Sequence, residues 1–338
     1  MSHDAQTPMV EVDAVSRRFG RRQDWIERVA TRIGLAKQPP VVRAVDNVSI
    51  TVRKGEVVGL VGESGCGKST LGRMVAGLLA PSSGEVRIDG QALGMKSAAR
   101  AQDRRAHLRT QMIFQNPFAS LNPRLTVGEI IMEAPMAHKL VTGNPADYLA
   151  LQMERAGLNP AYRDRLPHQF SGGQRQRIGI ARALAVQPEL LVCDESVAAL
   201  DVSIQAQILN LFMSLRDQLG LTYLFISHDL GVVKHISDRV VIMYLGRVVE
   251  EAATETIFQR PSHPYTQALL AEVPRIDLEQ RAFDTIQGEL PSPLSPPSGC
   301  HFHPRCPRAI ERCRSESPEI RMIGPGHRAA CHLAQSTT

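Results

Sequence analysis

Residues 62 to 69, GESGCGKS, have the residue types and the spacing of a loop that binds phosphate. They fit the pattern G-x-x-x-x-G-K-S/T, and they lie between the apolar run VVGLV and the helix-forming run TLGRMVAGLL. Glycines let backbone N–H groups curl around a phosphate without Cβ clashes. Lys68 can then reach the terminal phosphates, and the Ser69 hydroxyl can bind Mg²⁺. Because a chance match is expected only about once in a hundred chains of this length, this stretch predicts a nucleotide site.

An acidic pair ends a second informative run, LLVCDE, at residues 190 to 195. Asp194 is placed to hold Mg²⁺, directly or through water. Glu195 projects beyond the end of the expected strand, where it can polarise a water that faces the γ-phosphate. Taken alone, an acidic pair after a strand belongs to an ordinary turn about as often as to a functional site. The functional interpretation of this pair therefore depends on the other motifs of the chain.

The stretch FSGGQRQR, residues 170 to 177, is a second candidate for phosphate binding. Ser171 and two glycines open what reads as a helix, and the N–H groups at a helix N-terminus attract anions. The chain already has a phosphate loop a hundred residues earlier. One nucleotide site within a single chain does not explain why both stretches are present.

The elements that must position these residues follow an α/β pattern. The apolar runs VVGLV, ELLVCDE and TYLFIS are bounded by polar residues, as buried parallel strands are. MVEVDAVSRRF, VVRAVDNVSITV and EVRIDG read as further strands, and RVVIMYLGRVVE reads as a hairpin that turns at Leu245-Gly246. Residues from about 98 to 187 are mostly helical in pattern. Strands that alternate with helices indicate a parallel sheet covered on both faces.

Composition narrows the class of protein. A length of 338 residues predicts about two domains. The segment from Arg17 to Arg43 has eight basic and two acidic residues and thus a charge of +6, so the rest of the chain, whose net charge is +5 overall, is close to neutral. A nucleic-acid binder more often spreads basic side chains over a folded face, so no nucleic acid is expected as a partner. No apolar run approaches the ~18 residues that span a bilayer, and the N-terminus does not resemble a secretory signal.

Taken in order, the motifs resemble the ATP-binding subunits of ABC transporters. Gly62–Thr70 resemble the Walker A loop, Leu190–Glu195 the Walker B strand, and Ser171–Gln174 the signature motif. Gln115 resembles the Q-loop residue, Asp201 ends a D-loop, and His228 resembles the switch histidine. The resemblance assigns nucleotide binding to Phe19, Gly62, Glu63, Ser64, Gly65, Cys66, Gly67, Lys68, Ser69, Thr70 and Gln115. It assigns catalysis to Lys68, Glu195 and His228, Mg²⁺ binding to Ser69, Gln115 and Asp194, and action on a partner's ATP to Ser171, Gly172, Gly173 and Gln174.

The resemblance also implies a fold and a domain organisation. We expect an α/β P-loop NTPase core of ABC type with an antiparallel β subdomain, a helical subdomain and a small Cys-rich C-terminal extension. The nucleotide-binding domain would cover residues 1–261, with a basic insert at about 21–40 and the helical subdomain at about 98–187; the extension would cover 262–338. The insert reads as a solvated surface segment, or as an amphipathic helix near a membrane or partner. Phe19 would stack on adenine, although an aromatic residue that ends a strand is as often part of a core.

Further stretches narrow the resemblance to the dipeptide and oligopeptide import branch. These are CDESVAALD, SHPYTQALL, GELPSPLSPPSGC and four C-terminal cysteines. The branch implies ATP hydrolysis that energises import, a peripheral position on the cytoplasmic face of the membrane, and several partners: a second ATPase subunit, usually a different chain, two membrane permease subunits and an extracytoplasmic solute-binding protein. Ser196-Val197 replace the usual Pro-Thr, which spares every charged group. Nickel, glutathione or glycosides are alternative cargoes, and a soluble ABC ATPase acting on nucleic acid or ribosomes is the alternative class.

In this family two nucleotide-binding domains face each other head to tail. The resemblance therefore implies that FSGGQ closes over ATP held by the partner's phosphate loop, which explains the second phosphate-seeking helix. The γ-phosphate charge would attract the helix N-terminus and the Ser171 hydroxyl, and hydrolysis would release them. The stretch NPFASLNPRLTVGEII after Gln115 would form the groove that docks the permease subunits.

The cysteine spacing Cys300-x5-Cys306-x6-Cys313-x17-Cys331 predicts a metal site rather than disulfides in a reducing cytosol. It is looser than the paired C-x-x-C of zinc ribbons, and four thiolates can hold either Zn²⁺ or an iron–sulfur cluster. The resemblance favours a 4Fe–4S cluster over Zn²⁺, and four unligated reduced cysteines are the remaining alternative. The tail has too little apolar content to form its own core, so we expect a metal to fold it.

Overall fold

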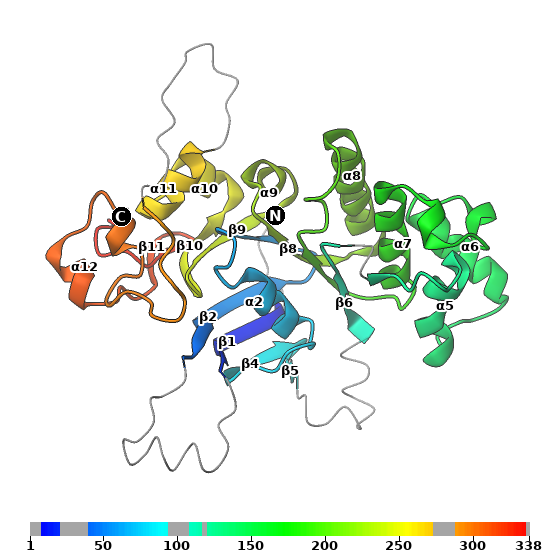
Figure 1. The fold of residues 1–338 in the computed structure, drawn as a ribbon, viewed down its shortest axis with the longest axis horizontal. Coiled ribbons are helices and arrows are strands. Elements are labelled where there is room, and N and C mark those ends of the chain that lie inside the picture. Colours follow the sequence, from blue (N-terminus) through cyan, green and yellow to red (C-terminus); the bar gives the residue numbers. More distant parts are fainter. Residues whose placement is uncertain (1–7, 21–39, 94–107, 117–119, 273–287, 336–338) are drawn as a thin grey trace, which may run out of the picture.

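The computed structural model describes residues 8–20, 40–93, 108–116, 120–272 and 288–335. The basic insert at about 21–40 lies almost wholly outside the described residues, and so do residues 117–119 of the expected docking stretch. Two sheets form the centre of the molecule, with a helical region on one side and the C-terminal extension on the other (Figure 1). Within the described residues, no helix combines the length and the apolar character needed to cross a membrane.

The larger sheet has eight strands in the order β11-β12-β10-β9-β3-β8-β7-β6. Its parallel part contains β3 (Val57–Val61), β6 (Thr110–Ile113), β7 (Leu190–Asp194), β8 (Thr222–Ser227) and β9 (Arg239–Tyr244). The predicted parallel strands and the hairpin from β9 to β10 (Arg247–Ala253) are confirmed. The helical reading of 98–187 is wrong at β6, which pairs in parallel with β7 and belongs to this sheet. A four-residue strand leaves too short a run for its period to be recognised.

The smaller sheet is antiparallel, with strand order β2-β1-β4-β5. Its strands are β1 (Pro8–Phe19), β2 (Val42–Arg53), β4 (Ser83–Ile88) and β5 (Gln91–Ala92). Helix α2 (Lys68–Val75) packs between the two sheets, where Leu71 and Met74 share one core with Val12, Ile50 and the strands of the larger sheet. This packing fixes the helix that follows the phosphate loop against both sheets.

The other face of the larger sheet is covered by helices. These are α8 (Val202–Leu219), α9 (Leu230–Ile236), α10 (Thr254–Gln259) and α11 (Pro264–Ala271). Phe212 of α8 packs edge to face on Tyr223 and Phe225 of β8, which anchors this layer. The sheet is thus covered on both faces, as the alternating pattern predicted.

The helical region contains α5 (Val127–Ala137), α6 (Pro145–Arg155) and α7 (Gly172–Leu184), with the short 3₁₀ turns η1 (Pro160–Tyr162) and η2 (Pro167–Gln169). Thr126 begins α5 through a capping box with Glu129, and α5 and α6 both pack on α7. Helix α7 in turn contacts β6 and α8, so the helical region is continuous with the main core.

The C-terminal extension continues the larger sheet. It contains η3 (His303–Arg305), α12 (Glu311–Ser315), β11 (Arg321–Gly324) and β12 (His327–Ala329), and β12 pairs antiparallel with β10. Glu250 of β10 is fully buried, and its carboxylate accepts hydrogen bonds from the backbone N–H groups of Ser262 and His263 and contacts His327 Nε2 at 2.7 Å. Burial alone raises the pKa of Glu250, but these hydrogen bonds bring it below its ordinary value.

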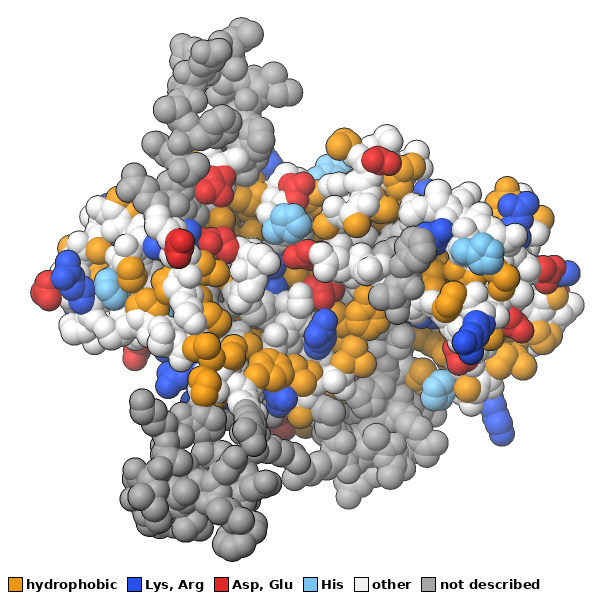
Figure 2. All heavy atoms as spheres, in the orientation of Figure 1, with side chains coloured by type: hydrophobic (Ala, Val, Ile, Leu, Met, Phe, Trp, Pro, Cys, Tyr) orange, Lys and Arg blue, Asp and Glu red, His pale blue; other side chains and the backbone are white. Residues whose placement is uncertain are grey.

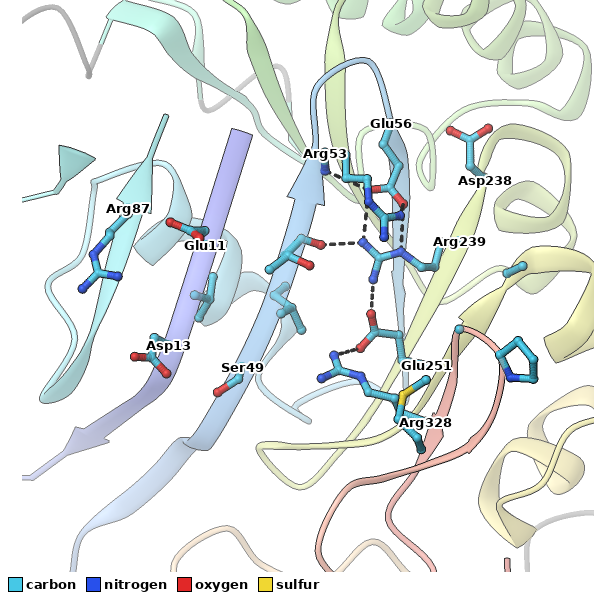
Figure 3. Close-up of a pocket in the computed structure, with 17 residues that line it drawn as sticks. Glu11, Asp13, Ser49, Arg53, Glu56, Arg87, Asp238, Arg239, Glu251 and Arg328 are labelled. Carbon is cyan, nitrogen blue, oxygen red and sulfur yellow. Dashed lines mark hydrogen bonds and ion pairs between the residues drawn. The ribbon is translucent and has the colours of Figure 1, made fainter. Parts of the chain in front are cut away.

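A group of ion pairs lies beside the small sheet, where the Arg239 guanidinium also donates to the carbonyl oxygen of Thr51 in β2 (Figure 3). Arg239 of β9 pairs with Glu56 at 2.8 Å and with Glu251, and Arg328 of β12 pairs with the same Glu251. The extension is therefore attached by strand pairing and by the partly buried Arg328–Glu251 ion pair, which the expectation of a metal-folded tail does not include.

Candidate nucleotide site

The phosphate loop links the C-terminal end of β3 to α2. Gly62 and Gly67 adopt φ values of 156° and 106°, and Gly67 occupies the N-cap position of α2 in a left-handed conformation. A Cβ at Gly67 would lie 2.1 Å from the carbonyl oxygen of Ala44. Both the backbone conformation and the close approach of β2 therefore require glycine here.

Lys68 lies inside this loop. Its Nζ donates hydrogen bonds to the carbonyl oxygens of Gly62 at 2.6 Å and Glu63 at 2.9 Å, and only 3% of the residue is exposed. A buried ammonium needs such acceptors, because burying an unpaired charge is costly. Cys66 of the loop is also buried, and burial raises the pKa of its thiol. The two carbonyl oxygens thus hold the Lys68 ammonium inside the phosphate loop.

Ser69 and Asp194 bring the loop and the acidic pair together. The Ser69 hydroxyl donates to Asp194 Oδ1 at 2.7 Å. They meet because β3 and β7 both run parallel to β8, so their C-terminal ends lie at one edge of the sheet. Burial raises the pKa of Asp194 above its ordinary value, although the Ser69 hydrogen bond and the nearby cations oppose this rise. A hydroxyl and a carboxylate at this edge are oxygen ligands of the kind that Mg²⁺ prefers.

Glu195 lies at the centre of a second group of side chains at the same edge. Gln115 Nε2 donates to Glu195 Oε2 at 2.7 Å, and His228 Nδ1 lies 3.5 Å from Glu195 Oε1. These three residues follow β7, β6 and β8, three neighbouring strands. Glu195 has a φ of 47°, a conformation that non-glycine residues seldom adopt. Such strain is concentrated at functional sites, where the surrounding contacts maintain it.

The signature stretch forms the N-terminus of α7. Ser171 Oγ accepts a hydrogen bond from the Gln174 N–H, and Gln174 Oε1 accepts one from the Ser171 N–H, which completes a capping box. Ser171 and Gly172 are exposed, whereas Gly173 is buried and a Cβ there would lie 2.4 Å from Ile204 Cγ2. The helix therefore begins at the surface, where Ser171 and Gly172 are exposed.

Two further predicted residues, Phe19 and Asp201, are exposed on the surface. Phe19 ends β1 with 40% of its surface exposed, and the Arg17 guanidinium lies 4.7 Å from its ring centroid. Asp201 is the N-cap residue of α8 and is exposed together with Val202. Figure 2 shows one face of the molecule: charged side chains and a histidine lie near its middle, and hydrophobic side chains lie below them over β1 and β2. Adenine stacking by Phe19 stays a prediction.

Two residues of the extension contact the phosphate loop and were not predicted. Arg305 pairs with the Glu63 carboxylate, and Tyr265 accepts a hydrogen bond from the Glu63 N–H. In the sequence, Tyr265 belongs to the stretch SHPYTQALL and Arg305 precedes Cys306, so neither residue points to the phosphate loop. No spacing rule connects residues more than 200 positions apart, and the sequence carries no signal for these contacts.

The four C-terminal cysteines are all free, and Cys313 and Cys331 are buried. Burial raises the pKa of the Cys300 thiol to about 11, and the other three thiols contribute to this rise. The Cys300 N–H donates to the Cys313 carbonyl oxygen at 2.8 Å, and thiolates are ligands that suit a soft metal. Among the described side chains, however, no group of three or more His, Cys, Asp or Glu residues is arranged to hold a metal ion. The iron–sulfur cluster and its Zn²⁺ alternative stay predictions.

Two family models match the chain. The model described as ABC transporter matches residues 45–198, and the model described as oligopeptide/dipeptide transporter, C-terminal region, matches residues 249–313. The chain's fold is similar to the dimeric ATP-binding cassette MJ0796 bound to ADP and Pi, with a TM-score of 0.61 and 26% identity, covering 73% of this chain and 99% of that one. The fold and these matches place the chain among the ATP-binding cassettes of ABC type.

Curated relatives show to which group of ABC transporter proteins the chain belongs. The chain is 50% identical to the "Probable peptide ABC transporter ATP-binding protein y4tS" of Sinorhizobium fredii, covering 87% of this chain and 83% of that protein. It is 49% identical to the oligopeptide transport ATP-binding protein AppF of Bacillus subtilis, covering 86% of this chain and 90% of that protein. The chain belongs to the family of peptide ABC transporter ATP-binding proteins. The predicted family, fold class and ATPase class are confirmed.

Proposed function

We propose that this chain is the ATP-hydrolysing subunit that energises a peptide ABC importer. The observation that carries the proposal is the position of Glu195, strained in its backbone and contacted by Gln115 and His228, beside the Ser69–Asp194 pair. This arrangement supports phosphoryl transfer to water, which requires mainly positioning and charge stabilisation. The names of the curated relatives support a peptide as the cargo.

In the proposed mechanism, backbone N–H groups of residues 62–70 and the Lys68 ammonium bind the β- and γ-phosphates. Ser69 and Asp194, with Gln115 nearby, would hold Mg²⁺, which supplies charge neutralisation on the phosphate oxygens when bound. Glu195 orients the attacking water and accepts its proton as the water oxygen bonds to phosphorus and the bond to the ADP oxygen breaks. His228 positions Glu195 and hydrogen-bonds the γ-phosphate.

The proposed assembly is a dimer of nucleotide-binding domains with membrane subunits. Ser171, Gly172, Gly173 and Gln174 act on ATP bound to a second ATPase subunit, a different chain, and Asp201 lies at the same interface. The exposed start of α7 and the dimeric cassette of similar fold support this arrangement. The further partners are two permease subunits and an extracytoplasmic solute-binding protein, with this chain peripheral on the cytoplasmic face. We assign residues 1–261 to the nucleotide-binding domain and 262–338 to the extension.

Peptide-driven turnover tests the proposed function. We expect the chain, reconstituted in proteoliposomes with its permease and solute-binding subunits, to import a dipeptide and to hydrolyse ATP faster when the dipeptide is present. Lys68→Ala abolishes both activities because it removes the cation that binds the terminal phosphates. Lys54→Ala, which removes only one exposed ion pair with Asp89, leaves them unchanged. Stimulation by nickel or glutathione in place of peptide contradicts the cargo, and stimulation by RNA alone contradicts the class.

We further propose that Cys300, Cys306, Cys313 and Cys331 bind a 4Fe–4S cluster, with Zn²⁺ as the alternative. The hydrogen bond from the Cys300 N–H to the Cys313 carbonyl oxygen places two of the four cysteines close together, which supports a shared site. We expect the anaerobically purified chain to contain about four iron atoms. Cys306→Ala lowers the iron content, whereas Cys66→Ala, the same change outside the extension, does not. A folded chain without iron contradicts the cluster, and one equivalent of zinc supports the alternative.

A further inference from the structure

The extension contacts the phosphate loop at one residue, Glu63. Arg305 Nη1 donates to Glu63 Oε1 at 2.9 Å and to Oε2 at 3.0 Å, and the Arg305 side chain is only 7% exposed. A guanidinium this well buried interacts with a carboxylate more strongly than an exposed pair does, because water screens it less. The two residues are 242 positions apart in the chain.

The backbone of Glu63 is held from the same side. Its N–H donates to the Tyr265 hydroxyl at 2.9 Å, and Tyr265 is fully buried in α11. The carbonyl oxygen of Glu63 accepts the hydrogen bond from Lys68 Nζ. The N–H and the carboxylate of this loop residue are therefore fixed by the C-terminal region, while its carbonyl contacts the catalytic lysine.

Buried aromatic rings hold the two contacting side chains in place. Tyr265 lies 4.7 Å from Tyr244 of β9 and 5.3 Å from Phe302, measured between ring centroids, and Phe302 lies 5.3 Å from Tyr244. Arg305 lies three residues after Phe302 and contacts the Tyr244 hydroxyl at 3.4 Å. Such clusters bury large apolar surfaces with defined ring geometry. The position of Arg305 is thus set by the packing of the extension on the main sheet.

We propose that Arg305, assisted by Tyr265, is a positioning residue for nucleotide binding and acts through Glu63. Glu63 places a carboxylate in the loop that receives a polyphosphate, and Arg305 neutralises that charge and fixes its direction. Without Arg305 the carboxylate repels the phosphates in the ground state and in the transition state alike. Such a loss raises KM while kcat is retained. The inference rests on the proposed role of the loop as an ATP site, and it makes the extension part of that site.

The test compares ATP binding and steady-state hydrolysis among variants of the full chain. We expect Arg305→Ala to raise the KM and the Kd for ATP about tenfold, with kcat within about twofold. Arg305→Lys restores part of the affinity, because it keeps the charge but not the two-oxygen contact. The double variant Arg305→Ala/Glu63→Gln binds ATP close to the native level, because the unpaired carboxylate is gone. Arg308→Ala, a change of an exposed arginine of the extension, leaves KM unchanged.

Several outcomes overturn the inference. An unchanged KM in Arg305→Ala excludes a positioning role, and equal defects in Arg305→Ala and the double variant exclude action through Glu63. If Arg305→Ala fails to fold, the double variant and Tyr265→Phe carry the test, because neither leaves an unpaired buried charge; a native Kd for ATP in Tyr265→Phe then contradicts the proposal. If the native chain itself does not bind ATP, the proposed function fails, which is a separate result.

Discussion

Glu195→Gln is expected to leave ATP binding intact and to slow ATP hydrolysis by about 10²–10⁴-fold, the usual contribution of a general base. The amide has the size of the carboxylate and can still accept the hydrogen bond from Gln115, so the local geometry is retained. It cannot accept the proton of the attacking water. Because Ser69, Asp194 and Lys68 are untouched, the affinity for ATP and Mg²⁺ should stay at the native level.

Single-turnover hydrolysis and direct measurement of ATP binding check this prediction. Single turnover isolates the chemical step from the release of ADP and phosphate. Glu154→Gln, the same change on an exposed position of α6, is the matched control and should hydrolyse ATP at the native rate. A Glu195→Gln chain that turns over within tenfold of the native chain removes Glu195 from the role of general base.

Much of the main sheet and of the nucleotide site can be predicted because the relevant signals are local. The phosphate loop, the apolar strand before Asp194 and the strand before His228 each combine a short apolar run with a polar end. Parallel strands place such ends at one edge, so the meeting of Ser69 with Asp194, and of Glu195 with His228, follows from the strand reading alone. The strained φ of Glu195 has no such signal, since it depends on how β7 meets α8.

The strand β6 and the attachment of the extension were missed for physical reasons. Thr110–Ile113 is too short to show a period, and it lies in a stretch dominated by helical pattern. The extension was expected to need a metal because it has little apolar content of its own. It also adds β11 and β12 to the sheet of the main domain and packs Phe302 on Tyr244 of β9. When a segment is stabilised by packing against another domain, its composition alone does not reveal how it folds.

A second large effect is expected from Gly172→Asp, which tests whether the start of α7 acts on the partner's ATP. A Cβ at Gly172 would meet only Leu200 Cδ2, at 3.8 Å, an ordinary contact. An acidic residue in the first turn of a helix also stabilises that helix. The variant should therefore fold, whereas a side chain at Gly173 would collide with Ile204.

The added carboxylate would face the γ-phosphate of the nucleotide on the partner subunit. Two unit charges about 5 Å apart repel by roughly 3 kcal/mol at an effective dielectric constant of about 20, so hydrolysis should fall about 10²-fold. The variant's own affinity for ATP should not change, because its own phosphate loop is intact. ATP-dependent association of the ATPase subunits, measured by light scattering, should be weakened to the same extent as hydrolysis.

Gly179→Asp is the matched control, because it adds the same charge to the same helix two turns from its start, at a position with nothing within 4 Å of the new Cβ. It should hydrolyse ATP at close to the native rate. Full-rate hydrolysis by an assembly in which every ATPase subunit carries the Gly172→Asp change would show that α7 does not contact the reacting nucleotide. Loss of ATP binding by the isolated variant would show instead that α7 acts on the nucleotide of its own chain. Only lost association with retained binding agrees with a site shared between two subunits.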